Sequence, residues 1–210
     1  LAADDDPAVA WMARRALDGA FDPAVLEGRL GDHAFSDAPS AKPPYGLRSA
    51  DELPHVPRVH AALALCHPRF DINLGVAIRS AEAAGFQEVF VIGREEVFRS
   101  PARGTERVLD LHYAPDAAAL IRLARERDYQ LVAIQQTPDS VPFHHAVYPP
   151  RPLFIVGAED RGMPAPLRLG ADLVVEIPQF GIIDSLNVAA AATTVIMHWR
   201  AHRDLAPGPT

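Results

Sequence analysis

The sequence predicts an α/β domain in which helices cover both faces of a parallel sheet. Short apolar runs alternate with segments of helical periodicity from residue 59 to residue 201. The runs are apolar throughout instead of alternating with polar residues, which is typical of strands buried on both faces. The chain has 210 residues, of which 49% are hydrophobic, so it can bury a substantial core.

The N-terminal quarter differs from the rest. Apolar residues recur at helical spacing over residues 7–20, and Asp22 and Pro23 are typical of the start of a second short helix. Residues 31–57 hold five prolines and little periodicity, which indicates a linker. We therefore expect a helical extension with a proline-rich linker over 1–57, a main domain over 58–204 and a flexible tail over 205–210.

The main domain is expected to contain five strands and four helices. We place the strands at 59–66, 88–92, 130–135, 153–157 and 173–177, and the helices at 73–84, 116–127, 165–169 and 185–201. Asn73 can cap the first helix, which ends at Gly85, a favourable residue after a helix. Ser185 is the candidate cap of the last helix, because its hydroxyl can accept from an unpaired N–H of the first turn. The segments 93–105 and 137–151 are predicted loops.

Composition excludes several classes of protein. The net charge of −7 argues against a general nucleic-acid binder. The acidic start shows no signal-peptide pattern and the chain has no run of 18 apolar residues, so we expect a cytoplasmic protein without a membrane span. The one cysteine, Cys66, fits a reducing compartment and is expected to be buried. The adjacent His144 and His145 are poorly spaced for a metal, and we expect none.

A cluster of arginines supports two interpretations. Arg94, Arg99, Arg103 and Arg107 are interrupted by glutamates within a predicted loop. The cluster is either a solvated loop or a phosphate-binding loop, because the guanidinium fork matches phosphate geometry. The sequence leaves both interpretations open.

Three segments carry candidate chemistry. In the first, Asn73 and Arg79 lie on one helix, where an arginine among apolar residues is unusual for packing alone. In the second, a strand runs into a turn with Gly157 and Glu159, but no P-loop lysine follows. In the third, Ser185 opens an alanine-rich helix, and a helix N-terminus can bind a ligand. Taken singly, these segments also fit a surface arginine, a plain turn and a capped core helix.

Taken together, the three segments resemble the SpoU/TrmH branch of the SPOUT RNA methyltransferases over residues 58–202. The matching motifs are Asn73-Leu-Gly75-x3-Arg79-x-Ala81-x3-Gly85, Val156-Gly157-x-Glu159-x2-Gly162 and Ile177-Pro178-x2-Gly181-x3-Ser185-Leu186-Asn187-Val188. The stretch 103–113 resembles the family only loosely, and Ala189 stands where many relatives have serine.

The resemblance implies a Rossmann-like core with a deep trefoil knot near the C-terminus, although true knots are otherwise almost absent from proteins. It also implies a homodimer that binds S-adenosylmethionine and methylates a ribose 2′-hydroxyl of RNA, either tRNA or rRNA. Two alternatives remain, namely a non-catalytic RNA-binding paralogue and a methyltransferase for a non-RNA substrate, because one scaffold can host several functions.

The resemblance also assigns residues to roles. Ile134, Gly157, Ile177 and Leu186 are expected to line the cofactor pocket. Arg79 corresponds to the catalytic residue, and we expect it to stabilise developing alkoxide charge, because an arginine is always protonated and makes a poor base. The other expected catalytic residues are Asn73, Glu159, Ser185 and Asn187.

Overall fold

The structure is a computed structural model that describes residues 58–94, 105, 109–182 and 185–205. The predictions for residues 1–57 and 206–210 lie outside the described residues, as do Arg99, Arg103 and Arg107 of the arginine cluster.

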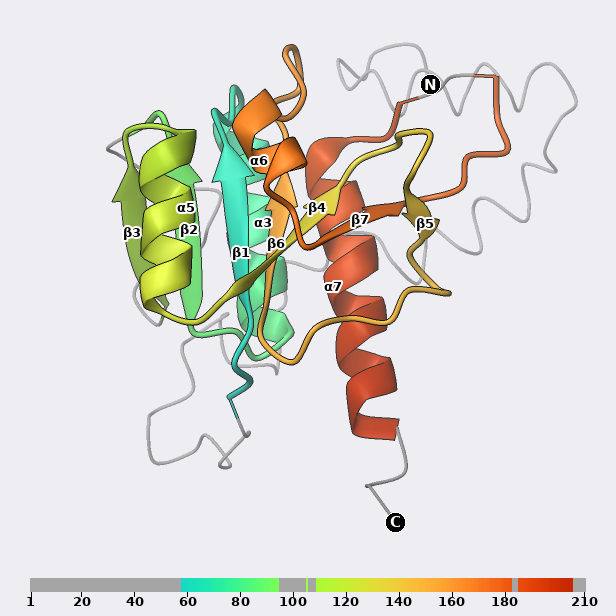
Figure 1. Cartoon of the computed structure of the whole chain (residues 1–210), viewed down its shortest axis with the longest axis horizontal. Helices are drawn as coiled ribbons and strands as arrows, with labels where there is room; N and C mark the ends of the chain where they lie inside the picture. Colours follow the sequence, from blue (N-terminus) through green and yellow to red (C-terminus); the bar gives the residue numbers. More distant parts are fainter. Residues whose placement is uncertain (1–57, 95–104, 106–108, 183–184, 206–210) are drawn as a thin grey trace, which may run out of the picture. The chain divides into compact units, whose positions relative to one another are not determined.

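Seven parallel strands form one sheet in the order β3-β2-β1-β6-β4-β7-β5 (Figure 1). Their bounds are β1 Ala62–Cys66, β2 Glu88–Ile92, β3 Asp110–Ala114, β4 Gln130–Ile134, β5 Val141–Pro142, β6 Pro152–Val156 and β7 Leu173–Glu176. Strand β6 is inserted between β1 and β4, and it pairs with both in parallel register. The predicted parallel sheet is therefore confirmed.

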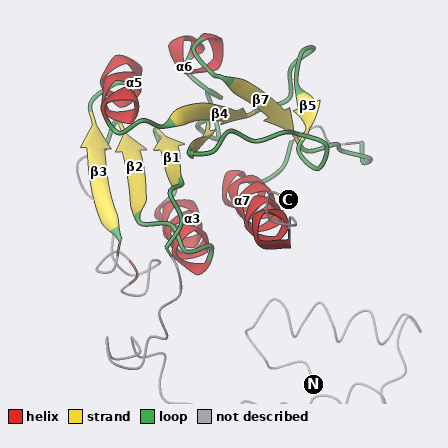
Figure 2. Cartoon of the chain, turned by 60° about the horizontal axis from the view of Figure 1, so that its bottom comes forward, coloured by secondary structure: helices red, strands yellow, loops and turns green. Residues whose placement is uncertain are grey.

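Helices cover both faces of the sheet, as predicted. The helices are α3 Asp71–Ala83, α5 Ala117–Glu126, α6 Ala165–Leu169 and α7 Val188–Leu205. Figure 2 shows α5 and α6 on one face and α3 and α7 on the other. Among the described residues, no helix has the length and apolar character needed to span a bilayer.

The core consists of one apolar cluster on each face of the sheet. Every residue of the central strands β1 and β6 is buried, which explains their continuous apolar sequences. Under α3 and α7, the ring of Phe154 lies 6.0 Å from that of Phe86 and 5.5 Å from that of Trp199. Cys66 is buried as predicted, and burial raises the pKa of its thiol to about 12.

Two strands were not predicted, because both lie at the edges of the sheet. β3 carries exposed and half-buried polar residues, and β2 is its only partner among the described strands, so it lacks the apolar run of a central strand. Its His112 Nε2 lies 2.8 Å from Glu88 Oε1 on the neighbouring strand. β5 contains Pro142, and proline is tolerated in a strand mainly at an edge.

Both predicted helix caps are wrong. α3 begins at Asp71, so Asn73 lies within the first turn and its side chain is available for other contacts. α7 begins at Val188, and its cap is Asn187, whose Oδ1 accepts from the backbone N–H groups of Ala189 and Ala190 at 3.0 and 3.1 Å. Asparagine and serine are equally good caps, so the sequence alone did not separate Ser185 from Asn187.

The predicted end of the first helix is confirmed. Gly85 has a φ of 79°, the left-handed conformation that glycine adopts without strain. Its N–H donates to the Glu82 carbonyl at 2.8 Å, and the N–H of Phe86 donates to the Ala81 carbonyl at 3.0 Å. These two bonds are the Schellman arrangement that closes a helix at its C-terminus.

We predict that Phe154→Ala lowers the free energy of unfolding by about 3–5 kcal/mol, because truncating a fully buried ring leaves a cavity. Urea denaturation followed by circular dichroism would measure the loss. Leu169→Ala is the control, since this side chain is 75% exposed, and a change below about 0.5 kcal/mol is expected. Equal losses in the two variants would contradict this account of the core.

Candidate active site

A cleft of about 870 Å³ lies where β4, β6 and β7 end, facing the first turns of α3 and α7. Ligand sites of open α/β sheets lie at this carboxyl edge. Eight of the nine predicted site residues line the cleft: Asn73, Ile134, Gly157, Glu159, Ile177, Ser185, Leu186 and Asn187. The structure thus brings together the three sequence motifs.

A chain of hydrogen bonds joins the three motifs. The Asn73 side-chain amide donates to Glu159 Oε1 at 2.8 Å, and the backbone N–H of Arg69 donates to Glu159 Oε2 at 3.0 Å. Asn187 Nδ2 donates to Asn73 Oδ1 at 3.0 Å, while Asn187 Oδ1 caps α7. Glu159 therefore anchors the loop before α3. Asn73, which Glu159 holds, in turn accepts from Asn187 at the start of α7, so the hydrogen bonds connect all three segments.

The hydrogen bonds to Glu159 also lower the pKa of its carboxyl group. Burial acts to raise the pKa of this carboxyl, but the bonds from the Asn73 amide and from the backbone N–H groups of Arg69, Glu159 and Phe70 outweigh burial and lower the pKa. Glu159 is therefore the ionised acceptor of the network and is poorly suited to hold a proton for transfer.

The Glu159 turn depends on two glycines. Ala158 and Gly162 exchange backbone hydrogen bonds of 2.9 and 3.0 Å, which places Glu159 at the tip of a tight turn. Gly162 has a φ of 67°. A Cβ on Gly157 would lie 2.5 Å from the Gly162 carbonyl carbon and from the Met163 nitrogen, so the strand end has no room for a side chain there.

The deep part of the cleft combines apolar walls with an unsatisfied polar atom. Ile134 and Met163, each 8% exposed, and Leu186, 46% exposed, all line the cleft. Gln135 directly follows β4, and its buried Oε1 has no hydrogen-bond partner among the described residues. The cleft thus fits a ligand that has apolar surface and a hydrogen-bond donor. Gln135 was not among the predicted site residues. Its position as a polar residue directly after a buried strand is the feature of the sequence that could have identified it.

Arg79 does not line the cleft. Its side chain is exposed on α3, seven residues after Ile72, which does line the cleft. Ile72, Val76 and Arg79 follow helical spacing along one stripe of α3, and this stripe begins at the rim of the cleft. The structure thus separates Arg79 from the other eight predicted residues.

The Ser185 hydroxyl is exposed and makes no hydrogen bond within the described residues. It lines the cleft beside Leu186, although it does not cap α7. Among the described residues, no group of three histidine, cysteine or acidic side chains is arranged to hold a metal ion.

Comparison with known proteins agrees with this arrangement. Residues 60–198 match the SpoU rRNA Methylase family. The tRNA (guanosine(18)-2′-O)-methyltransferase of Thermus thermophilus is 26% identical over 134 residues, which cover 62% of this chain and 69% of the relative.

Two solved structures share the fold. An AdoMet-bound rRNA methyltransferase from Sinorhizobium meliloti is similar with a TM-score of 0.63 and 29% identity, covering 68% of this chain and 56% of that one. The TrmH/SpoU tRNA modifying enzyme of A. aeolicus is similar in fold, with a TM-score of 0.65 at 19% identity over 70% of this chain and 77% of that one. Because the family match spans well over half of the sequence, the chain belongs to the SpoU rRNA Methylase family.

Proposed function

We propose that this protein transfers a methyl group from S-adenosylmethionine to a ribose 2′-hydroxyl of RNA. The observation that carries the proposal is the cleft in which three distant motifs meet. The names of the relatives support it, since they describe 2′-O-methylation of tRNA and methylation of rRNA. The RNA itself is either tRNA or rRNA.

The deep cleft is the proposed cofactor site. Ile134, Ile177 and Leu186 would contact apolar surface of the cofactor, and Gln135 Oε1 would accept one of its donors. The absence of a side chain at Gly157 would let the ligand approach the backbone closely. When bound, S-adenosylmethionine supplies an electrophilic methyl group on a sulfonium.

Arg79 is the proposed catalytic residue, although it lies outside the cleft, on the stripe of α3 that begins with Ile72 at the rim. In such a transfer the hydroxyl proton would pass to water and the carbon–sulfur bond of the sulfonium would break as the oxygen–carbon bond forms, leaving S-adenosylhomocysteine. The Arg79 guanidinium would stabilise the negative charge that develops on the ribose oxygen. An arginine cannot serve as the base, because it stays protonated in proteins. Arg79 would reach the substrate from the stripe of α3 that leads to the cleft.

The remaining polar residues are proposed to position the reactants. Asn73 and Asn187 form the edge of the cleft and are fixed through Glu159 and through the start of α7. Ser185 lines the same edge, and its hydroxyl makes no hydrogen bond to any described residue, so it is suited to contact the incoming ribose. Orientation of this kind can contribute up to about 7–11 kcal/mol to lowering a barrier.

We further propose that the C-terminal segment forms a trefoil knot and that the protein acts as a cytoplasmic homodimer. The insertion of β6 between β1 and β4 supports the knot. The exposed Phe180 and Ile182 beside the cleft support the dimer, since apolar side chains gathered at a surface often mark an interface. Residues 58–204 would form the methyltransferase domain, with 1–57 as an extension and 205–210 as a tail.

The direct test is transfer of labelled methyl groups. The protein is incubated with labelled S-adenosylmethionine and, separately, with unmodified tRNA, with rRNA and with a protein extract. Label in one RNA class, and its location on a ribose after nuclease digestion, would support the proposal. Label in protein alone would favour a different substrate, and no label in any sample would favour a non-catalytic role.

We predict that Arg79→Ala lowers kcat by about 10²–10³-fold, because a donor to the developing charge is lost. Binding of S-adenosylmethionine, measured by calorimetry, should stay unchanged, because Arg79 lies outside the cleft. Arg122→Ala, which removes an exposed arginine on α5, is the control and should leave kcat unaltered. Unchanged turnover in Arg79→Ala would refute the assigned role.

We predict that the stabilising effect of Glu159 depends on pH. Since the folded-state pKa lies below the ordinary value of 4.5, ionised Glu159 stabilises the fold above that pH, and the effect disappears as the pH falls through the lowered pKa. The thermal midpoint of Glu159→Gln should therefore lie below that of the wild type at neutral pH and converge with it in acid. Glu126→Gln, in a loose exposed pair of 3.8 Å, is expected to change little at any pH.

We predict that Gly157→Ala weakens binding of S-adenosylmethionine and costs about 1–3 kcal/mol of stability, because the new methyl group meets backbone atoms. Calorimetry and chemical denaturation would measure the two effects. Gly181→Ala is the matched control, because a Cβ there meets no atom of a described residue within 4 Å. A fully stable Gly157→Ala protein with normal binding would contradict the close packing of this turn.

A further inference from the structure

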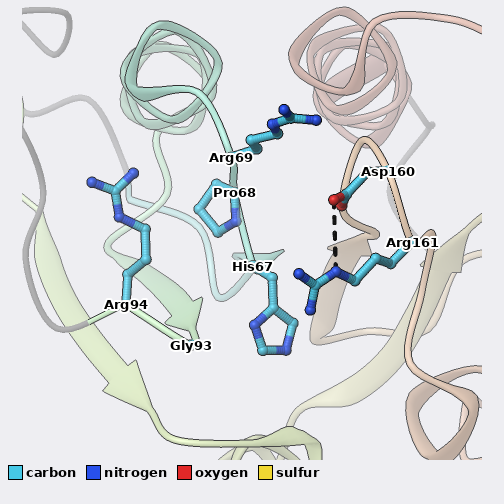
Figure 3. Close-up of a pocket in the computed structure, with 7 residues that line it drawn as sticks. All are labelled: His67, Pro68, Arg69, Gly93, Arg94, Asp160 and Arg161. Atoms are coloured by element: carbon cyan, nitrogen blue, oxygen red, sulfur yellow. Dashed lines mark ion pairs between the residues drawn. The ribbon is translucent and has the colours of Figure 1, made fainter.

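A second pocket lies beside the cleft and has a different chemical character. It measures about 560 Å³ and is lined by His67, Pro68, Arg69, Gly93, Arg94, Asp160 and Arg161 (Figure 3). Three of these residues are arginines, whereas none of the described residues that line the cleft is an arginine. The two hollows therefore suit different ligands, and the second suits an anion.

The backbone conformation of His67 and its neighbour Gly93 fix the position of the His67 ring. Its φ is 44°, a left-handed conformation that is uncommon for a residue with a side chain, and its backbone N–H donates to the Ile92 carbonyl at 2.9 Å. A Cβ on Gly93 would overlap the His67 imidazole, so the ring can lie there only because residue 93 is glycine. Unusual backbone at a pocket wall is a feature of binding and catalytic sites.

The described acidic residues neutralise the positive charges of the pocket only in part. Arg94 pairs with Asp71 at 2.6 Å, whereas the Arg161–Asp160 pair is looser, with Nε 3.6 Å from Oδ2. In Figure 3 the terminal nitrogens of Arg161 point toward the His67 ring. The Arg69 guanidinium lies 5.3 Å from the centre of the Phe70 ring and has no ion-pair partner among the described residues. Arg69, which has no ion pair with a described residue, and Arg161, whose one ion pair with a described residue is long, are thus the residues best placed to bind an anion.

Glu159 links this pocket to the cleft. It accepts from the backbone of Arg69, which lies on one wall of the pocket, and from the side chain of Asn73, which lies in the cleft. The next two residues, Asp160 and Arg161, line the pocket. The two sites consequently share the loop before α3 and the Glu159 turn, and they are held in a fixed relation to each other.

We propose that this basic pocket binds a backbone phosphate of the RNA, next to the nucleotide whose ribose enters the cleft. The inference rests on the proposed function, because it assigns the ligand to the same RNA strand. Arg161, with its planar guanidinium fork, would contact the phosphate oxygens, while Arg69 and His67 flank them. The pocket would thereby position the strand without reading its bases. It also gives a protein of net charge −7 a local site for a polyanion.

The test measures equilibrium binding of total tRNA and of total rRNA by filter retention, at several salt concentrations, with S-adenosylhomocysteine present. Arg161→Gln and the double variant Arg69→Gln/Arg161→Gln are compared with the wild type. We expect the double variant to raise Kd by about tenfold for the RNA that the wild type binds. The slope of log Kd against log salt should fall by about 0.7 for each lost phosphate contact.

Arg122→Gln is the matched control, because it removes the same charge from an exposed site on α5 and should leave the slope unchanged. Calorimetric binding of S-adenosylmethionine should be unaltered in every variant, which separates loss of the pocket from loss of the fold. Equal Kd and slope in the double variant and the wild type would overturn the proposal, as would an effect equal to that of Arg122→Gln.

The binding assay keeps this proposal distinct from the proposed function. If the wild type binds RNA through Arg69 and Arg161 but transfers no label, the proposal of a phosphate-binding pocket is supported and the proposal of methyl transfer is refuted. If label is transferred and the variants bind as the wild type does, the methyl transfer stands and the pocket assignment is wrong. Absence of any RNA binding by the wild type would overturn the pocket assignment.

Discussion

The hydrogen bonds around Glu159 are the constraint on which the site depends. One carboxylate holds the loop before α3 through the Arg69 backbone and the Asn73 side chain, and Asn73 in turn holds Asn187 at the start of α7. The residues joined in this way are 86, 90 and 114 positions apart in the chain. The sheet brings them near one another, but these polar contacts determine the shape of the cleft edge. Without the ionised acceptor, the two asparagines would lose the anchor that they share.

The sequence predicted the parallel sheet and the helices on both faces because its central strands are apolar at every position. It missed β3 and β5, whose stability comes from edge pairing and from contacts such as His112 with Glu88. Such contacts depend on residues far apart in the chain and leave no local periodicity. The same limit explains why Asn187 and not Ser185 caps α7, since both residue types suit that position and tertiary contacts decide between them.

The candidate site shows a similar division. Motif resemblance singled out eight residues that the structure places in one cleft, because strand ends and the following turns are local features that parallel strands bring to one edge. Neither the position of Arg79 on the helix stripe outside the cleft nor the basic pocket around His67 followed from the motifs. His67, Arg94 and Arg161 come from three different loops, and only the arrangement of β1, β2 and β6 brings these loops together.

The double role of Asn187 has a consequence for the timing of assembly. Its carbonyl oxygen starts α7, and its amide nitrogen completes the edge of the cleft. An α7 that is not seated would therefore leave the cleft edge without its contact from Asn187 to Asn73, so the packing of the helix and the completeness of the edge are coupled. During synthesis on the ribosome, the strands of the sheet and Glu159 emerge before Asn187. A nascent chain thus lacks the wall of the cleft formed by Asn187, Val188 and Ala191 until these residues have emerged.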